Sequence, residues 1–208
     1  MTNSSPYSAS ITGCSFKFYE FMRVLPLLMA DNADELLKQE LELNEHIQIN
    51  SRKARQTFLN EFKKRFTAVP RSFWLYFMEQ DETAQRAGVL FSILKAYKLV
   101  FDFHFNVTVR KHNSIEQQVS KSDIIMELNE IAANDEFVDS WSDSTKEKCA
   151  STYITILKQS GLMIDNTLAP IRLTPEQAQY YFLANEEWFL EALLLLPYEI
   201  NDIKSQLP

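Results

Sequence analysis

Residues 51–66 read SRKARQTFLNEFKKRF, and the apolar side chains of this stretch recur at helical spacing. They are Ala54, Phe58, Leu59, Phe62 and Phe66. Ser51 stands where the N-cap residue of a helix is expected, and Val69–Pro70 ends the segment. One apolar side and one polar side predict an amphipathic α-helix, and this stretch therefore favours a helical fold.

The same spacing continues on both sides of this stretch. Expected helices lie at residues 33–43, 71–78, 82–101, 122–133, 144–160 and 174–196. Residues 101–109 alternate apolar and polar side chains, so a helix and a short strand both stay open there. Residues 162–173 favour a small hairpin, which Pro170 weakens. We predict an all-α fold: a compact multi-helix globule with helix-turn-helix-like elements and room for one small β-ribbon, or wing.

We expect two helical halves packed as one compact unit, a size that suits the 208 residues. The N-terminal half, residues 1–110, contains a basic helix-turn-helix-like segment at 31–66. The C-terminal half, residues 111–208, contains a winged-helix-like segment at 122–173. A core of this size needs no metal or disulfide to hold it together.

The net charge of −7 is unevenly distributed along the chain. Residues 52–71 carry 7 − 1 = +6, and the other residues carry 14 − 27 = −13. A negative body repels nucleic acid everywhere except at a basic face. At 100° per residue, six polar side chains share one third of the helix that follows Ser51, opposite its apolar side. They are Arg52, Lys53, Gln56, Asn60, Lys63 and Lys64.

This basic face predicts a DNA-binding site, because cations neutralise phosphates and amides pair with base edges. The first-turn N–H groups after Ser51 would also lie near a phosphate. A second recognition helix at 144–160 offers a weaker copy of the site. The predicted DNA-binding residues are Ser51, Arg52, Lys53, Arg55, Gln56, Asn60, Lys63, Lys64, Lys148 and Thr152. Burial of these cations, or their pairing with the acidic helix at 34–45, would remove the main support for this prediction.

Several classes of function are disfavoured. Gly13, Gly88 and Gly161 are too few and too scattered for a phosphate-binding glycine loop. Cys14 and Cys149 form no CxxC pair, and no histidines have metal-ligand spacing, so we expect no metal and no cofactor. No catalytic constellation is evident, so we expect no enzyme. No segment approaches the roughly 20 apolar residues of a membrane span. We expect a cytoplasmic monomer that does not bind membranes.

Five short motifs occur in an order that resembles the BrxA family of bacteriophage exclusion (BREX) defence systems. They are Tyr7–Gly13 (YSASITG), Ser51–Arg55 (SRKAR), Trp141–Lys146 (WSDSTK), Leu157–Ile164 (LKQSGLMI) and Ile171–Leu173 (IRL). The resemblance implies an all-α protein with helix-turn-helix elements that binds DNA in phage defence and has no catalytic residues. Where the family often has a second glycine after Gly13, this chain has Cys14.

The prediction is therefore a non-enzymatic protein of a BREX-type system that binds double-stranded DNA mainly through phosphate contacts. Two alternatives stay open. The chain could be a protein–protein adaptor that docks on larger subunits of the same defence complex, which makes other BREX subunits candidate partners. It could also bind RNA, because a basic helix does not distinguish RNA from DNA.

Overall fold

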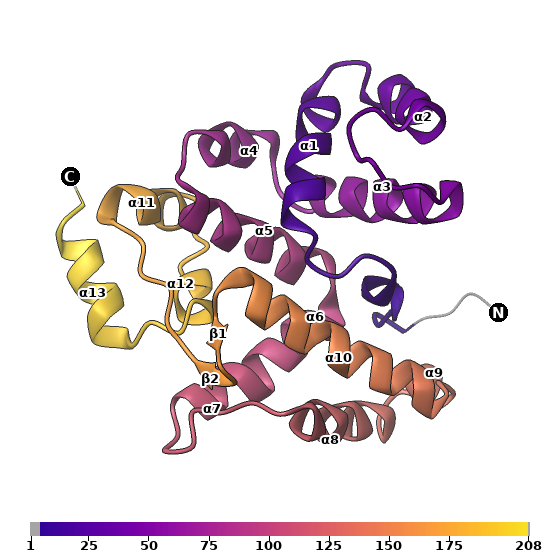
Figure 1. Cartoon of the computed structure of the whole chain (residues 1–208). Helices are drawn as coiled ribbons and strands as arrows, with labels where there is room; N and C mark the ends of the chain where they lie inside the picture. The colour runs from indigo at the N-terminus through magenta and orange to yellow at the C-terminus, as the bar shows by residue number, and fades with distance from the viewer. Residues whose placement is uncertain (1–4, 208) are drawn as a thin grey trace.

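The chain folds into a compact set of helices with one small pair of strands (Figure 1), which confirms the predicted all-α class with a small β-ribbon. The computed structural model describes residues 5–207; residues 1–4 and 208 of the two predicted halves lie outside this range. The first elements are η1 (Ser10–Gly13), α1 (Phe18–Met29), α2 (Ala33–Leu43), α3 (Arg52–Thr67), α4 (Arg71–Met78), α5 (Glu82–Ala96) and α6 (Lys98–Asp102). They are followed by η2 (Phe103–Val109), α7 (Arg110–His112), α8 (Lys121–Ala132), α9 (Glu136–Asp139), α10 (Asp143–Ser160), β1 (Met163–Ile164), β2 (Thr167–Leu168), α11 (Pro175–Leu183), α12 (Trp188–Ala192) and α13 (Pro197–Ser205).

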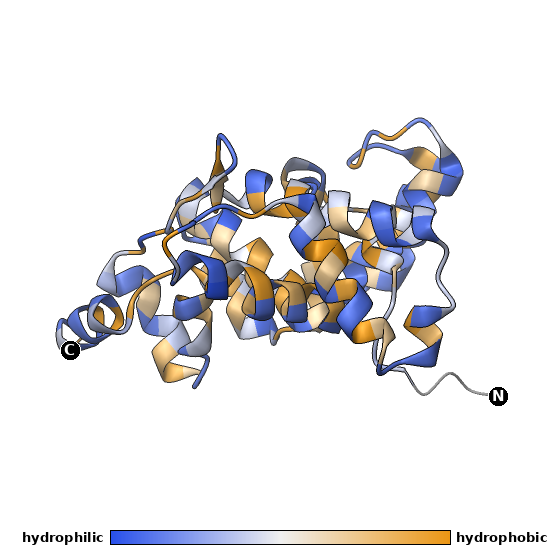
Figure 2. Ribbon diagram, turned by 90° about the horizontal axis from the view of Figure 1, so that it is seen from below, coloured by the Kyte–Doolittle hydropathy of each residue, from blue (hydrophilic) through white to orange (hydrophobic). Residues whose placement is uncertain are grey.

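Several helices begin at capping side chains that stand directly ahead of them. The Oγ of Ser51 accepts a hydrogen bond from the N–H of Ala54 at the start of α3. Thr174 forms a capping box with Gln177 at the start of α11. Helix α8 has Ser120 as its cap, two residues before Ser122, the cap that the sequence predicts. Between these starts the helices alternate hydrophobic and hydrophilic positions, as Figure 2 shows.

Residues 98–112 form one continuous helical run, so a helix occupies the segment for which a strand was the alternative. Its middle part, η2, is a π-helix. The alternation arose because Phe103 is apolar and its neighbour His104 is polar, yet both are fully buried. The hydroxyl of Tyr153 in α10 lies 3.0 Å from Nδ1 of His104 and 2.5 Å from Oγ1 of Thr108. The polar side chains of His104 and Thr108 therefore face protein instead of solvent, which a two-residue pattern cannot describe.

The buried imidazole of His104 predicts a pH-dependent stability. Its Nε2 lies 2.7 Å from the carbonyl oxygen of Ala192, and burial lowers its pKa to about 4. The unfolded chain, with a histidine pKa of about 6.5, binds the proton more readily, so the free energy of unfolding falls as the pH drops from about 6.5 towards 4. We expect a loss of about 2 kcal/mol between pH 7 and 5 that His104→Gln lacks.

Urea denaturation at the two pH values measures this difference. His46 is exposed, so His46→Gln is the matched control and keeps the wild-type loss. An identical pH dependence in wild type and His104→Gln would contradict the assignment.

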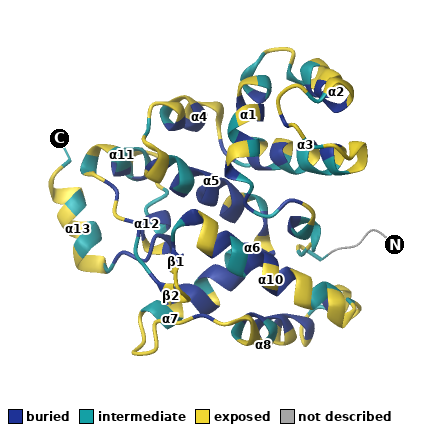
Figure 3. Cartoon of the chain, viewed as in Figure 1, coloured by how far each residue is buried: buried dark blue, intermediate teal, exposed yellow. Residues whose placement is uncertain are grey.

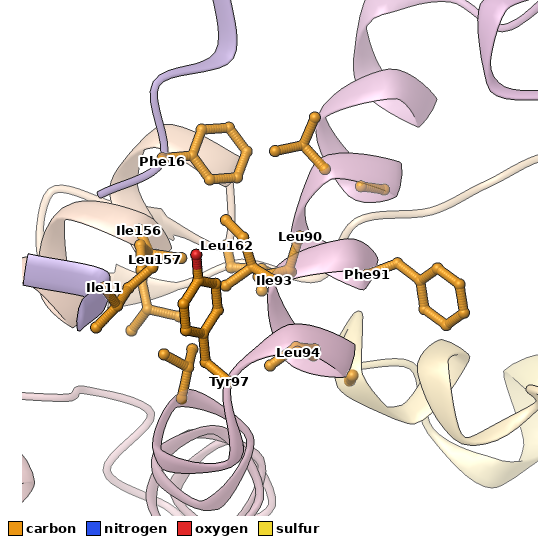
Figure 4. Close-up of a cluster of buried hydrophobic side chains, with 14 of the residues drawn as sticks. Ile11, Phe16, Leu90, Phe91, Ile93, Leu94, Tyr97, Ile156, Leu157 and Leu162 are labelled. Carbon is orange, nitrogen blue, oxygen red and sulfur yellow. The ribbon is translucent and has the colours of Figure 1, made fainter. Parts of the chain in front are cut away.

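The hydrophobic core is one connected cluster with α5 at its centre, where every residue from Ala87 to Leu94 is buried (Figure 3). Figure 4 shows Ile11 of the N-terminal segment and Ile156 of α10 beside Tyr97, at the end of α5. The short helix η1 contacts both α3 and α10. A Cβ on Gly13 would come within 2.8 Å of the Thr57 side chain, so the absence of a side chain there allows η1 to lie against α3. The N-terminal motif thus joins the two predicted halves, and the boundary between them stays a prediction.

Candidate nucleic-acid interface

The connection from α2 to α3 is held by two buried charged side chains. The carboxylate of Glu40 accepts hydrogen bonds from the N–H groups of His46 and Ile47, at 3.0 and 2.8 Å. The guanidinium of Arg55 donates to the carbonyl oxygens of Leu41 and Ile49, at 2.9 and 2.7 Å. Together they satisfy backbone groups that a long connection would otherwise leave without partners.

Arg55 was counted among the DNA-binding residues, but the structure places its side chain in the interior, only 8% exposed. At 100° per residue Arg55 lies about 300° from Arg52, inside the sector of the apolar stripe. Its guanidinium is committed to the backbone carbonyls of the α2–α3 connection, so it has no donor face towards solvent.

The N-cap Ser51 and five polar residues of α3 form an exposed stripe, which we call the α3 face. They are Ser51, Arg52, Lys53, Gln56, Asn60 and Lys63. The side-chain amide of Gln56 donates to Asn60 Oδ1 at 3.0 Å. A groove of about 300 Å³ lies between this stripe and α2. The structure therefore brings six of the ten predicted residues together on one surface.

Two cations of the α3 face are paired with the acidic helix α2. Arg52 pairs with Glu42 near the C-terminal end of α2, and Lys63 pairs with Asp34 at its N-terminal end. The hydrogen bonds from these cations lower the pKa of both carboxyl groups. Pairing with this helix was the condition that would weaken the DNA prediction, and it is met for Arg52 and Lys63.

Lys64 also differs from the prediction, because it is half-buried instead of facing solvent. Its ammonium lies 4.2 Å from the ring centroid of Tyr97 and 3.4 Å from Ser10 Oγ, and burial lowers its pKa. The α3 face has three cations, Arg52, Lys53 and Lys63, and among the described residues only Lys53 forms no ion pair. The charge available to a ligand is thus much smaller than the +6 counted along the sequence.

The second candidate segment has the element order of a winged helix. Strands β1 and β2 pair antiparallel, with Met163 opposite Leu168. Gln118, which precedes α8, forms an antiparallel bridge with Thr167, and the N–H of Leu168 donates to the carbonyl of Gln117 at 3.0 Å. The chain therefore runs α7, the bridge residue Gln118, α8, α9, α10 and a two-stranded wing. Figure 1 shows the wing beside the end of α10.

The outer side of α10 carries small polar and basic residues, and we call it the α10 face. It comprises Ser144, Lys148, Ser151, Thr155, Lys158 and Gln159. Lys148 is exposed as predicted, and no ion pair involves it within the described chain. Thr152 was predicted to belong to this side, and this prediction is wrong: it is only 9% exposed. It lies at the edge of the apolar sector, next to Cys149 and Tyr153, which face the core.

A groove of about 620 Å³ adjoins the α10 face. Lys121 at the start of α8, Ser151 and Asn166 at the wing tip contribute to its lining. Lys121 also pairs with Glu147, the acid that α10 presents on this side. The sequence analysis missed these lining residues, because the groove forms only once the Gln118–Thr167 bridge closes the wing onto α8. The sequence features that could have indicated these lining residues were the serine caps of the helices and the turn at residues 165–166.

Acidic residues concentrate at the opposite end of this segment. Residues 122–145 contain no Lys or Arg. Asp123 lies at the start of α8 beside the groove, where it pairs with Lys111. The acids towards the opposite end are Glu127, Glu130, Asp135, Glu136, Asp139 and Asp143. A polyanion would be repelled from this corner, so it could approach α10 only from the side of the wing and the α8 start.

Residues 5–207 include no group of three or more His, Cys, Asp or Glu side chains placed to hold a metal ion. In the same range no helix has both the length and the apolar character needed to cross a membrane. Cys14 and Cys149 are buried free thiols, and burial raises the pKa of each to about 11.

The fold is that of a compact all-α protein with one small two-stranded sheet after α10. The BrxA family model matches residues 5–183, so the chain belongs to the BrxA family, and its role lies in BREX phage defence. Among solved structures, an uncharacterized protein from Magnetospirillum magneticum is similar, with a TM-score of 0.78 at 21% sequence identity. The match covers 91% of this chain and 98% of that one, and it supports the fold alone. No curated protein matches the chain.

Proposed function

We propose that this BrxA-family chain binds double-stranded DNA in BREX phage defence, with α10 as the helix that enters the major groove. The observation that carries the proposal is the wing, closed by the Gln118–Thr167 bridge beside the exposed polar side of α10. Helix-turn-helix proteins use this arrangement to present a recognition helix to base edges. Family membership supports the same function.

The chemistry of the α10 face suits DNA. A helix about 10–12 Å across fits a major groove about 12 Å wide. Ser151 lies near the middle of the face, where a hydroxyl can donate to or accept from a base edge. Lys148 and Lys158 are exposed on the same side and would contact phosphates.

The α3 face is proposed as a second, sequence-independent contact. Lys53 would contact a phosphate and Gln56 and Asn60 would face the DNA, whereas Arg52 and Lys63 would contact phosphates only where their carboxylate partners are displaced. The ion pairs of Arg52 and Lys63 are exposed, and such pairs contribute only about 0–1 kcal/mol. A phosphate can therefore replace the carboxylate partner, although the nearby acids weaken the contact.

The proposed activity is binding without chemistry of its own. The DNA would be oriented by the negative body, including the acidic corner at residues 122–145. Because the available cations are few, non-specific affinity would be modest at physiological salt.

Fluorescence anisotropy of a labelled 25-base-pair duplex over a salt series tests this function. If Lys53, Lys121, Lys148 and Lys158 each neutralise one phosphate, log K against log[salt] has a slope of about −3.6. Duplex RNA of the same sequence is expected to compete weakly, because its deep, narrow major groove does not admit α10. Salt-insensitive capture of a purified BREX subunit, with no shift of either duplex, would instead support the adaptor alternative.

A further inference from the structure

The carboxylates of α2 cover the α3 face at both of its ends. Asp34 meets Lys63, and Glu42 meets Arg52. These acids stand eight residues apart on one helix, so they lie about 12 Å apart along its axis. Two carboxylates thus lie against two of the three cations of the α3 face. The third cation, Lys53, lies in the same solvent-exposed stripe without a carboxylate partner among the described residues.

Both pairs remain accessible to a ligand. The side chains of Arg52 and Glu42 are 61% and 58% exposed, and those of Lys63 and Asp34 are 49% and 74% exposed. Exposed ion pairs of this kind contribute little to the stability of the fold. Stability therefore does not account for the presence of these two pairs. They are also close enough to water that another anion can displace the carboxylate.

The carboxylates cannot easily move away from the α3 face once displaced. Glu40, which lies between the two pairing acids in the sequence of α2, holds the α2–α3 connection through the N–H groups of His46 and Ile47. Arg55 holds the same connection from the α3 side. An anion that displaces Asp34 and Glu42 therefore still meets their charge nearby.

We propose that Asp34 and Glu42 are specificity-determining residues that compete within the molecule for the phosphate contacts of the α3 face. This inference rests on the proposed DNA binding. By occupying Arg52 and Lys63, the two carboxylates weaken binding to the DNA backbone of any sequence. Discrimination between DNA sequences then depends on the α10 face. Discrimination improves when the sequence-independent contact is weakened, since it contributes equally to right and wrong sites.

The test compares two variants with the same change in net charge. Asp34→Asn/Glu42→Gln frees Arg52 and Lys63, whereas Glu35→Gln/Glu45→Gln neutralises two exposed acids of the same region that form no ion pair among the described residues. We expect the first variant to bind the 25-base-pair duplex about tenfold more tightly. Its salt slope should be steeper by about 1.8, as two further phosphates are neutralised.

The control variant is expected to change affinity by less than about twofold through net charge alone. Adding Arg52→Gln/Lys63→Gln to the first variant is expected to return the affinity to the wild-type value. Equal gains in the two variants, or no gain in the first, would overturn the inference.

The outcomes separate this inference from the proposed function. If wild type binds duplex DNA and Asp34→Asn/Glu42→Gln binds no better, DNA binding stands and the competition is refuted. If wild type does not bind but the variant does, the competition is supported. If neither binds in low salt, both the function and the inference fall. A melting temperature within a few degrees of wild type shows that loss of the two exposed pairs leaves the fold intact.

Discussion

Ser151→Glu is expected to weaken the affinity for duplex DNA by about 100-fold, which would abolish most of the specific binding. Ser151 is exposed near the middle of the α10 face and adjoins the groove beside Lys121 and the wing. A carboxylate there would face the DNA acceptors and phosphates directly, and like charges placed across an interface cost several kcal/mol. Glutamate also favours a helix, so the fold is not expected to change. Anisotropy at one fixed salt concentration measures the effect.

The matched control is Asn201→Glu in α13. Asn201 is also an exposed helical residue, and the substitution changes the charge by the same amount. Its affinity is expected to stay within about twofold of wild type, because only the net charge of the molecule changes. A loss as large as that of Ser151→Glu, or wild-type binding by Ser151→Glu, would remove α10 from the interface.

Arg65→Ala is expected to lower the free energy of unfolding by about 3–5 kcal/mol. Arg65 is fully buried although it belongs to the most basic segment of the chain. Its guanidinium donates to the carbonyl oxygens of Ser15 and Phe16, the second at 2.8 Å, and packs over the ring of Phe62. Truncation leaves two buried carbonyls without their donor and creates a cavity between α3 and the N-terminal segment.

Urea denaturation measures this loss, and Lys53→Ala is the control on the same helix. Lys53 is exposed and unpaired within residues 5–207, so its truncation should change stability by less than about 0.5 kcal/mol. A loss below about 1 kcal/mol for Arg65→Ala would show that Arg65 does not anchor the N-terminal segment.

The helical fold was predictable from the sequence because its signals are local. The apolar spacing around Phe58 and Phe62 and the cap at Ser51 both predicted α3 correctly. Gly161 ends α10 with a φ of +95°, which suits a residue without a side chain. The π-helix at Phe103–Val109 was ambiguous, since its partner Tyr153 lies far along the chain.

The candidate site was only partly predictable, because charge was counted along the chain and not in space. Arg55 and Arg65 fall in the apolar sector of the helical wheel, about 300° and 220° from Arg52, so their burial had a usable signal. The pairing of Arg52 and Lys63 with α2 had no such signal, as it depends on how α2 packs. The Gln118–Thr167 bridge is likewise a long-range contact that no local pattern indicates.

Contact between α10 and DNA is what separates the proposed function from the adaptor alternative. Photocrosslinking from an azidophenacyl group on Ser151→Cys tests this directly, with Asn201→Cys as the reference position. Cys14 and Cys149 are buried with raised thiol pKa values, so the introduced cysteine is the one expected to react. We predict duplex crosslinks from residue 151 that unlabelled duplex competes away, and none from residue 201. Crosslinks of equal yield from both positions, or none from 151 while the duplex is bound, would contradict α10 as the DNA-binding helix.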